Sequence, residues 1–496
     1  MIDWIGYVLI GVYCILLSCI LMYCLLQLHL LWIYHRNKKK PGQQADLESE
    51  WPKVSIQLPI FNEKYVVQRL IESVCAIDYP RKKLQIQVLD DSTDETLEIT
   101  RQTVNTFQEK GFDIEILHRK NRSGYKAGAL KAALPKAKGE FIAIFDADFI
   151  PDAQFLYKTL PHFSSSQIGV VQTRWGHINE GYSLLTRLQA FQLNVHFCVE
   201  QTGRDIGGYF LQFNGTAGVW RKSTILDAGN WQSDTLTEDL DLSYRCQLKG
   251  WKITYLEQVK SPAELPAEMN GLKSQQYRWM KGGAETAKKI LPQLWKSNNS
   301  IAKKIHGSVH LLSSSIFIFV FLVALLSVPL MWYMELRSIS PKFLSVFFVG
   351  TISIIFVYYS ANVVQRGTSS GGAPTSLWKF IGLFPLFLSL SMGLSMHNSI
   401  AVWDGLRGKR TPFIRTPKYN ITTKKDGFAK GFYLSGDLPL STKLEIILAL
   451  VFLSASYYGW KEDYYAFLIF HLLLTLGFAS IAFYSINHMK KNERRS

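Results

Sequence analysis

The stretch Phe141-Ile142-Ala143-Ile144-Phe145-Asp146-Ala147-Asp148 places two carboxylates directly after five apolar residues. A short apolar run rich in aromatic and β-branched residues is typical of a buried strand. Two similar runs occur earlier, Val54-Ser55-Ile56-Gln57-Leu58 and Ile86-Gln87-Val88-Leu89, and helical patterns follow them at residues 63–74 and 94–107. This alternation of strands and helices predicts a parallel α/β sheet.

Acidic residues also follow the second of the earlier runs, as Asp90-Asp91. In an open α/β sheet the ligand binds beyond the carboxyl ends of the strands, so both acidic pairs should lie at a ligand-binding edge. Residues two apart in an extended turn point to the same side, and Asp146 and Asp148 can therefore face one divalent cation. Asp90 and Asp91 would accept hydrogen bonds from a nucleotide. The alternatives are a solvated turn at Asp146-Ala147-Asp148 and, after Asp90-Asp91, a cap for the next helix formed by Ser92-Thr93-Asp94.

Long apolar segments flank this soluble unit. The chain has 496 residues, of which 48% are hydrophobic, and five runs are long enough to span a bilayer: residues 4–34, 309–333, 343–363, 444–458 and 465–486. The first run exceeds a signal-peptide core and ends in basic residues without a small-residue cleavage site, so it should remain as an anchor. The composition therefore excludes a purely soluble protein.

The formal net charge of +16 gathers at the ends of these apolar runs. Basic residues in such places mark the cytoplasmic side of a membrane, and we predict that the catalytic domain and the basic loop at 404–432 are cytoplasmic. With five spans, the apolar segment 380–402 must then be re-entrant or interfacial. Membrane lipids and a sugar diphosphate, rather than nucleic acid, are the expected acidic partners.

These boundaries predict four parts of the chain. Residues 1–36 form an anchor, residues 37–50 a linker, residues 51–291 a catalytic domain that ends in interface helices, and residues 307–490 a membrane region. The six cysteines have no spacing typical of a metal site or a disulfide framework, so we expect them to pack as small apolar residues.

Three further motifs carry candidate chemistry. Asp239, with Glu238 beside it, can act as the base that an acceptor hydroxyl requires, although acidic residues at a helix start could equally stabilise the helix. Lys126 lies in a glycine-containing turn and is either a diphosphate contact or a surface lysine. Gln275-Gln276-Tyr277-Arg278-Trp279 combines an amide, a phosphate-binding guanidinium and a ring that can stack on a sugar, or forms an amphipathic helix on the membrane.

In this order, Asp90-Asp91, Asp146-Ala147-Asp148, Thr237-Glu238-Asp239 and the 275–279 motif resemble the D, D, D, QxxRW signature of processive family 2 glycosyltransferases. The resemblance covers most of residues 54–281. The wider sequence is similar to the plant cellulose synthase-like A and C proteins, which are mannan and glucan synthases, in Val88-Leu89-Asp90-Asp91-Ser92-Thr93-Asp94, Gly124-Tyr125-Lys126-Ala127-Gly128-Ala129-Leu130, Phe145-Asp146-Ala147-Asp148-Phe149 and Phe213-Asn214-Gly215-Thr216-Ala217-Gly218-Val219-Trp220-Arg221.

The resemblance implies a GT-A fold joined to an α-helical transmembrane region, and an inverting transfer that depends on Mg²⁺ or Mn²⁺. Asp148 would hold the cation with Asp146 beside it, and Asp239 would be the general base. The nucleotide sugar would be bound by Asp90, Asp91, Lys126, Asp146, Gln275 and Arg278. The acceptor glycan would contact Trp279, Phe213, Asn214, Gly215 and Thr216.

The stretch Phe413-Ile414-Arg415-Thr416-Pro417-Lys418 is similar to the FxVTxK gating loop of cellulose synthases, which closes over the donor. Arg415 stands where that family has valine, and a proline fills the free position, so Phe413, Arg415, Thr416 and Lys418 are the implied gating residues. In that family the membrane helices also form a channel for the growing polymer.

Several alternatives stay open at this level. The donor is GDP-mannose or UDP-glucose, and the product is a growing β-linked polysaccharide or a single sugar on a lipid. A catalytically silent scaffold or export component is the third alternative. The membrane is a bacterial inner membrane or a eukaryotic Golgi equivalent, and an oligomer or an export partner remains open.

Overall fold

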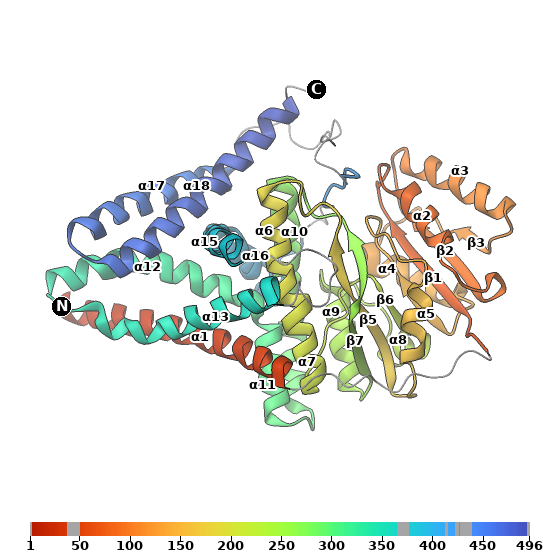
Figure 1. The fold of residues 1–496 in the computed structure, drawn as a ribbon, viewed down its shortest axis with the longest axis horizontal. Helices are drawn as coiled ribbons and strands as arrows, with labels where there is room; N and C mark the ends of the chain where they lie inside the picture. The colour runs from red at the N-terminus through yellow and green to blue at the C-terminus, as the bar shows by residue number, and fades with distance from the viewer. Residues whose placement is uncertain are drawn as a thin grey trace.

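The structure, a computed structural model, describes residues 2–36, 50–364, 376–411, 415–421, 426 and 439–493. A sheet domain and a region of long helices make up the molecule. In Figure 1 the sheet domain lies on the right, the long apolar helices extend to the left, and helices α6 (Leu184–Asn194) and α10 (Met269–Lys296) stand between them. The linker at 37–49 and Phe413 lie outside the described residues.

Seven strands form one mixed sheet in the order β3-β2-β1-β4-β6-β5-β7. Strand β6 runs antiparallel to β4 and β5, while the other neighbouring strands are parallel. The predicted parallel α/β sheet is thus confirmed for most of its strands, and β6 is the exception. The bounds are β1 (Val54–Ile60), β2 (Leu84–Asp90), β3 (Ile114–Ile116), β4 (Phe141–Ile144), β5 (Ile168–His177), β6 (Gly218–Arg221) and β7 (Lys252–Ala263).

Both faces of the sheet are covered. In the quoted strand β4 and the residue after it, Ala143 and Phe145 pack into one apolar cluster while Ile142 and Ile144 pack into the other, because successive side chains point to opposite faces. The first cluster includes side chains of α2 (Val67–Cys75), α3 (Thr96–Glu109) and α5 (Phe155–Thr159). The second includes side chains of α4 (Tyr125–Ala133), α8 (Lys222–Asp227) and α9 (Glu238–Leu248).

The strand register brings the acidic residues to one edge. Ile60 at the end of β1 pairs with Asp90 at the end of β2, and Gln57 pairs with Ile144 at the end of β4. Because these strands are parallel, their carboxyl ends share an edge. The segments that follow them, which begin with Phe61, Asp91 and Phe145, therefore leave the sheet on the same side.

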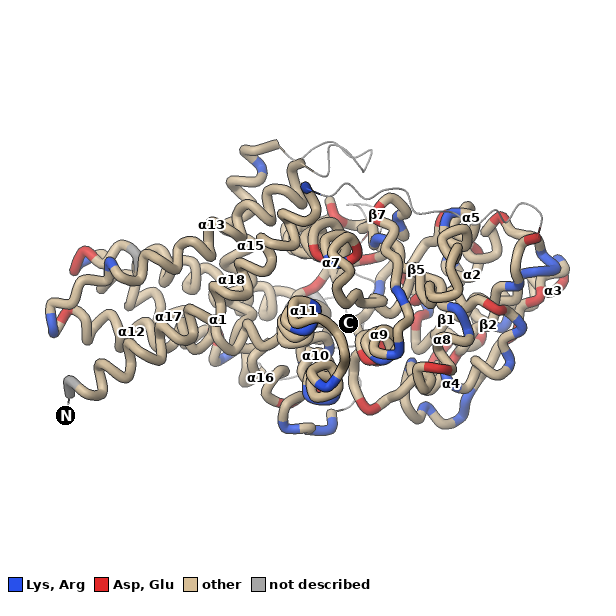
Figure 2. Tube along the Cα trace, turned by 90° about the horizontal axis from the view of Figure 1, so that it is seen from below, with Lys and Arg blue, Asp and Glu red and all other residues tan. Residues whose placement is uncertain are grey.

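Within the described residues, five helices are long and apolar enough to cross a membrane: residues 4–36 of α1 (Ile2–Arg36), residues 313–336 with α12 (Ile316–Leu336), residues 341–364 with α13 (Phe348–Tyr359), α17 (Leu440–Lys461), and residues 467–488 of α18 (Tyr465–Glu493). They overlap the five predicted spans. Helices α15 (Leu377–Gly393) and α16 (Ser395–Leu406) form a pair bent by 45° at the segment predicted to be re-entrant or interfacial. Figure 2 shows charged residues over the sheet domain and few along the middle of these long helices.

Three shorter helical elements connect the sheet domain with the region of long helices. A π-helical turn, η4 (Val195–Glu200), separates α6 from α7 (Gln201–Gly207), and α11 (Ile301–Leu311) follows α10. Helix α6 begins at a capping box, in which the side chains of Ser183 and Thr186 satisfy backbone N–H groups of the first turn. Helix α10 runs for 28 residues and carries the predicted 275–279 motif near its start.

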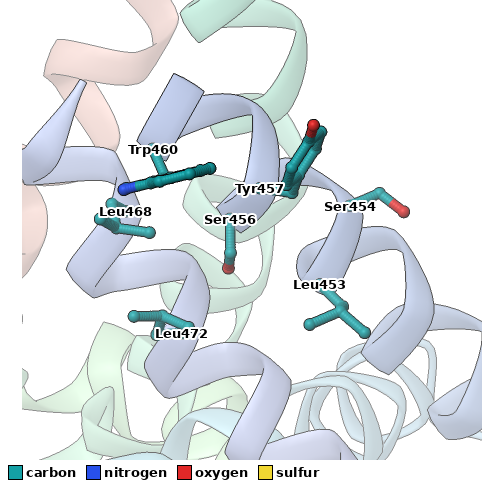
Figure 3. Close-up of a pocket in the computed structure, with 7 residues that line it drawn as sticks. All are labelled: Leu453, Ser454, Ser456, Tyr457, Trp460, Leu468 and Leu472. Carbon is teal, nitrogen blue, oxygen red and sulfur yellow. The ribbon is translucent and has the colours of Figure 1, made fainter. Parts of the chain in front are cut away.

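An apolar groove lies between α17 and α18, away from the acidic edge (Figure 3). Its side chains are largely exposed, with 64% of Tyr457 and 61% of Trp460 accessible. Both helices are candidate membrane spans, so this groove is a surface suited to lipid chains. The groove is lined by Leu453, Ser454, Ser456, Tyr457, Trp460, Leu468 and Leu472.

Candidate active site

Three of the predicted motifs meet at Lys126, in the first turn of α4. Its Nζ lies 2.6 Å from Asp146 Oδ1 and donates to the carbonyl oxygen of Gly215 at 2.9 Å. Burial alone would lower the pKa of Lys126, but the neighbouring carboxylates, Asp146 and Glu238 above all, raise it above its ordinary value. Lys126 is therefore a partly buried, charged group beside these carboxylates, and its role as a diphosphate contact stays a prediction.

Asp239 lies close to the same glycine. A Cβ atom added to Gly215 would come within 2.9 Å of Asp239 Oδ2 and 3.4 Å of Lys126 Nζ, and the backbone there has a φ of +80°. Only glycine suits this position, because a side chain would meet the carboxylate and the left-handed conformation disfavours other residues. Burial, followed by the charge of Glu238, raises the pKa of Asp239.

The second carboxylate of the Asp146–Asp148 turn faces a different lysine. Lys418 Nζ lies 2.6 Å from Asp148 Oδ2 and donates to the carbonyl oxygen of Glu264 at 2.6 Å. The carboxylate of Glu264 in turn accepts the backbone N–H groups of Tyr419 at 3.0 Å and Asn420 at 3.1 Å. The segment 415–421, which precedes α17 in the sequence, thus contacts the acidic edge of the sheet domain.

Two further contacts hold the same segment. Arg415 Nη1 lies 2.5 Å from Glu63 Oε2, and neither side chain is more than 15% exposed. Thr416 Oγ1 accepts a hydrogen bond of 2.8 Å from Arg278 on α10. Burial raises the pKa of Glu63 while Arg415 lowers it. The arginine that departs from the FxVTxK pattern therefore has a buried carboxylate as its partner.

Asp91 is held by a fork from Arg119, whose Nε donates to Asp91 Oδ1 at 2.9 Å and whose Nη2 contacts Oδ2. Asp90 is fully buried and accepts the backbone N–H of Ser92 at 2.8 Å. Helix α3 begins at Thr96, whose N–H donates to Asp94 Oδ1 at 3.0 Å. Asp94, which belongs to the stretch considered as a helix cap, therefore accepts a backbone N–H at the start of α3, although the residue directly before the helix, Glu95, makes no side-chain cap bond.

The 275–279 motif lies on α10 beside the same edge. The Tyr277 hydroxyl donates to Asp404 Oδ2 on α16 at 2.6 Å, while Gln275 and Trp279 are partly exposed. Burial lowers the pKa of Arg278, and the carboxylates of Asp146 and Glu238 oppose that shift. The guanidinium therefore faces the acidic turn.

The four residues of the 213–216 segment, which were predicted together with Trp279 to contact the acceptor, differ in position. Phe213 is fully buried and packs against Trp220, so this segment can contact a ligand only through its neighbours. Asn214 Oδ1 lies 2.9 Å from His196 Nε2, and Thr216 Oγ1 accepts the backbone N–H of Asp146 at 2.9 Å. The segment 213–216 is thus joined to the Asp146–Asp148 turn.

Four residues in contact with the predicted ones did not emerge from the sequence. Glu63 follows strand β1 and Glu264 directly follows strand β7, so the rule that placed acidic residues at strand ends could have found both. Arg119 and His196 lie in a loop and a helix without a distinguishing pattern, and only the fold brings them to Asp91 and Asn214.

Asp146 and Asp148 would hold a divalent cation together with a bound diphosphate. The described residues contain no group of three or more His, Cys, Asp or Glu side chains arranged to hold a metal ion. Magnesium commonly binds proteins through one or two carboxylates together with substrate phosphates. The two carboxylates of this turn suit a cation that arrives with a diphosphate, which supplies the remaining oxygen ligands.

Residues 52–282 match the family model described as glycosyltransferase like family 2. This stretch is a family 2 glycosyltransferase domain. The chain is 44% identical over 264 residues to glucomannan 4-beta-mannosyltransferase 1 of Oryza sativa subsp. japonica, covering 52% of this chain and 51% of the relative. It is 41% identical over 264 residues to glucomannan 4-beta-mannosyltransferase 9 of Arabidopsis thaliana, covering 52% and 50%. The chain thus matches about half the length of these curated relatives.

Among solved structures, the family 2 domain and its neighbouring helices resemble mannosyltransferase PcManGT of Pyrobaculum calidifontis, which was solved in complex with GDP-Man and Mn²⁺. The TM-score is 0.54 at 17% sequence identity, and the match covers 81% of this chain and 100% of that chain. With the family match and the mixed sheet, this likeness confirms the predicted GT-A fold.

Proposed function

We propose that this chain is an inverting membrane hexosyltransferase that uses a nucleotide sugar to extend a β-linked glycan. One observation carries the proposal: Lys126, Asp146 and Asp239 meet around Gly215 at the ligand-binding edge of a family 2 domain. The names of both relatives refer to mannose transfer. They favour GDP-mannose over UDP-glucose as the donor.

In this proposal Asp239 is the catalytic base. It takes the proton of an acceptor hydroxyl while that oxygen bonds to the anomeric carbon of the donor sugar, and the bond from this carbon to the diphosphate breaks on the opposite face. Configuration at the anomeric carbon is therefore inverted. A carboxylate whose pKa is raised by burial and by Glu238 accepts a proton more readily than an exposed aspartate does.

Positive charge near the Asp146–Asp148 turn would stabilise the leaving diphosphate. Lys126, Arg278 and Lys418 contribute it, since all three lie against this turn or the residues that contact it. When bound, Mg²⁺ or Mn²⁺ held by Asp148 and Asp146 adds further positive charge to the phosphate oxygens. We assign the rest of donor binding to Asp90, Asp91 and Gln275.

The acceptor glycan would approach Asp239 from the side of the 213–216 segment and Trp279. Asn214 supplies a partly exposed polar side chain there, buried Gly215 and Thr216 hold the segment behind it, and the ring of Trp279 supplies a face for a sugar. Arg415, Thr416 and Lys418 would close the donor side. With five helices able to span a membrane, the product would be exported from a cytoplasmic active site in a bacterial inner membrane or its Golgi equivalent.

The test is hexose transfer by membranes that contain the full chain. Labelled GDP-mannose and UDP-glucose are supplied separately with Mg²⁺, Mn²⁺ or a chelator, and the product is sized and digested with a β-mannanase. We expect a mannanase-sensitive polymer from GDP-mannose that requires the cation. A lipid-linked product of fixed size would replace polymer extension with single-sugar transfer, and no product from either donor would overturn the proposal.

Asp239→Asn is the decisive variant. Removal of a general base is expected to reduce the rate of transfer by about 10²- to 10⁴-fold. Asp227→Asn is the matched control, because Asp227 is exposed and bonds to Trp251 and Lys249 away from the site. Equal rates for the two variants would remove Asp239 from the mechanism.

A further inference from the structure

Helix α10 binds the segment that leads to Asp239 along one of its faces. Glu285 Oε2 accepts the backbone N–H of Leu236 at 2.8 Å, and the Thr286 and Thr237 hydroxyls lie 3.0 Å apart. A Cβ atom added to Gly282 would come within 2.6 Å of Thr237 Cγ2, so glycine permits this close approach. The spacing of three and four residues places Gly282, Glu285, Thr286 and Lys289 on one face of the helix.

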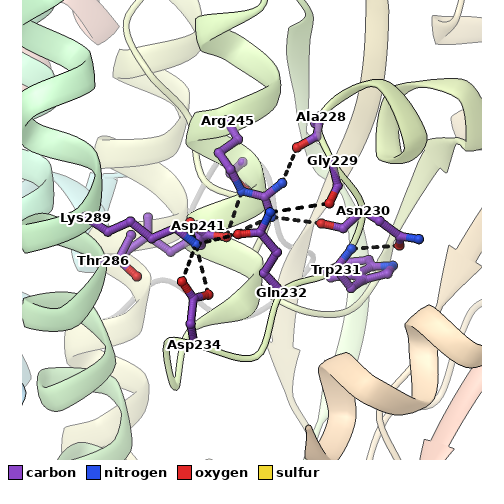
Figure 4. A network of polar contacts seen from close by, with 12 residues as sticks. Ala228, Gly229, Asn230, Trp231, Gln232, Asp234, Asp241, Arg245, Thr286 and Lys289 are labelled. Carbon is purple, nitrogen blue, oxygen red and sulfur yellow. Dashed lines mark hydrogen bonds and ion pairs between the residues drawn. The ribbon is translucent and has the colours of Figure 1, made fainter. Parts of the chain in front are cut away.

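Lys289 lies at the C-terminal end of this face of α10. Its Nζ donates to Gln232 Oε1 at 2.7 Å and lies 2.8 Å from Asp234 Oδ2 and 2.9 Å from Asp241 Oδ1. The ammonium group donates hydrogen bonds to Gln232 and Asp234, and it forms an ion pair with Asp241. Figure 4 shows Lys289 of α10 reaching across to Asp234 and Asp241.

Asp241 receives a second cation from its own helix. Arg245 Nε donates to Asp241 Oδ2 at 2.8 Å, its Nη2 donates to the carbonyl oxygen of Asn230 at 3.0 Å, and its Nη1 contacts the carbonyl oxygen of Ala228. The Asp241 side chain is fully buried. A buried carboxylate depends on its partners, so Asp241 fixes the first turn of α9 between Lys289 and Arg245.

We propose that Lys289, acting through Asp241, is a positioning residue for the catalytic base. Asp239 lies two residues before Asp241 in the same first turn, and the segment 232–241 is held to α10 over that whole length. Lys289 thereby fixes where the Asp239 carboxylate lies relative to Gly215 and Lys126. This inference rests on the proposed transfer reaction and adds a residue to it.

Loss of Lys289 should change the position of Asp239 without changing donor binding. Helix α10 has anchors of its own, because Lys273 Nζ lies 2.8 Å from Glu445 and the Tyr277 hydroxyl donates to Asp404. Loss of Lys289 should therefore release the 232–241 segment while Arg278 stays in place. The donor contact at Asp91 is likewise held by Arg119 within the sheet domain.

The test compares Lys289→Met with Lys288→Met in the full chain. Methionine keeps most of the lysine stem but lacks the charge, and Lys288 is an exposed neighbour that donates instead to the carbonyl oxygen of Leu406. We expect Lys289→Met to lower kcat by about 10- to 100-fold, as a misplacement of about 1 Å can do, with donor KM within about threefold of the wild type. Lys288→Met should keep wild-type values.

A conservative substitution distinguishes a positioning role of Lys289 from a general effect of this residue on the stability of the protein. Lys289→Arg keeps the positive charge and several donors, and it should recover most of kcat. Equal kcat values for Lys289→Met and Lys288→Met in an active wild-type background would overturn the inference alone, and so would a loss confined to donor KM. A wild type that transfers no hexose would overturn both the inference and the proposed function.

Thr286→Val provides a second route if Lys289→Met fails to accumulate in membranes. This change removes the hydroxyl contact to Thr237 and nearly preserves the side-chain shape. We expect kcat to fall by about threefold with unchanged donor KM, because the same segment loses one of its contacts to α10. An unchanged kcat would count against positioning by this face of the helix.

Discussion

The candidate site has two halves that form in different ways. In one half, Lys126 and Asp146 belong to the sheet domain and are separated by 20 residues in the sequence. In the other half, Lys418 reaches Asp148 from 270 residues away, in a segment between α16 and α17. The first half comes with the folding of the sheet, whereas the second exists only when the helical region is packed against it.

The halves also differ in what they contact. The domain half surrounds Asp239, the proposed base, while the 415–421 segment lies against Asp148, Glu63 and Glu264. We therefore expect damage to the domain half to affect the chemical step. Damage to the segment half should affect binding of the donor. Measuring the rate constant of the chemical step separately from that of donor binding tests whether the two halves have these different roles.

Of the two substitutions that compare the halves, Lys126→Met should have a larger effect than Arg415→Val. Its ammonium opposes the negative charge of Asp146, Glu238 and Asp239, and it is proposed to stabilise the leaving diphosphate. Removal of one such group from an active site costs about 10²- to 10³-fold in kcat. Initial rates with labelled donor measure the loss, and Lys131→Met, an exposed lysine of the same helix, is the control. Retention of more than about a tenth of wild-type kcat would contradict this assignment.

The domain half should also set the pH dependence. Burial and Glu238 raise the pKa of Asp239 to about 7. A base works in its deprotonated form, so kcat should rise as the pH increases through about 7 and fall about tenfold from pH 8 to pH 6. Profiles of kcat at saturating donor measure this limb. Arg415→Val should leave the limb in place, and a flat profile would argue against Asp239 as the base.

Arg415→Val should have a smaller effect than Lys126→Met. This effect should be an increase in donor KM. The change restores the valine of the FxVTxK pattern but leaves buried Glu63 without its guanidinium partner. We expect donor KM to rise about fivefold while kcat stays within about twofold, estimates that rest on the loss of one ion pair outside the chemical step.

The double variant with Glu63→Gln sharpens this result. It should recover part of the lost affinity, because the two changes act on one contact and are not additive. Arg410→Gln, in the exposed stretch before the segment, is the control. An unchanged KM in Arg415→Val, or fully additive effects in the double variant, would show that this ion pair does not hold the segment.

The sequence predicted the domain half better than the segment half for physical reasons. Buried strands such as β1, β2 and β4 leave continuous apolar runs, and carboxylates at their ends mark the ligand-binding edge. Strands β3, β5, β6 and β7 were not predicted. In β6, Gly218 and Arg221 leave only two apolar residues, so its neighbours β4 and β5, rather than an apolar run, make it a strand.

Long-range partners were beyond sequence reasoning. No spacing rule connects Arg415 with Glu63 or His196 with Asn214, because these contacts depend on how α6 and the helical region pack on the sheet. The 415–421 segment drew attention only through its similarity to a gating loop. Helix starts were displaced by a few residues, as at Val67, where a turn with Asn62 at a φ of +54° precedes α2.

The place of the 415–421 segment in the chain has a practical consequence for biochemical dissection. A fragment truncated after α10 would retain the whole sheet and both apolar clusters, yet Asp148 would lack Lys418 and Glu63 would lack Arg415. Such a fragment, which still carries the apolar helix α1, could fold and still give a misleading assay. Catalysis by this molecule is best measured on the intact polypeptide, in detergent or in a bilayer.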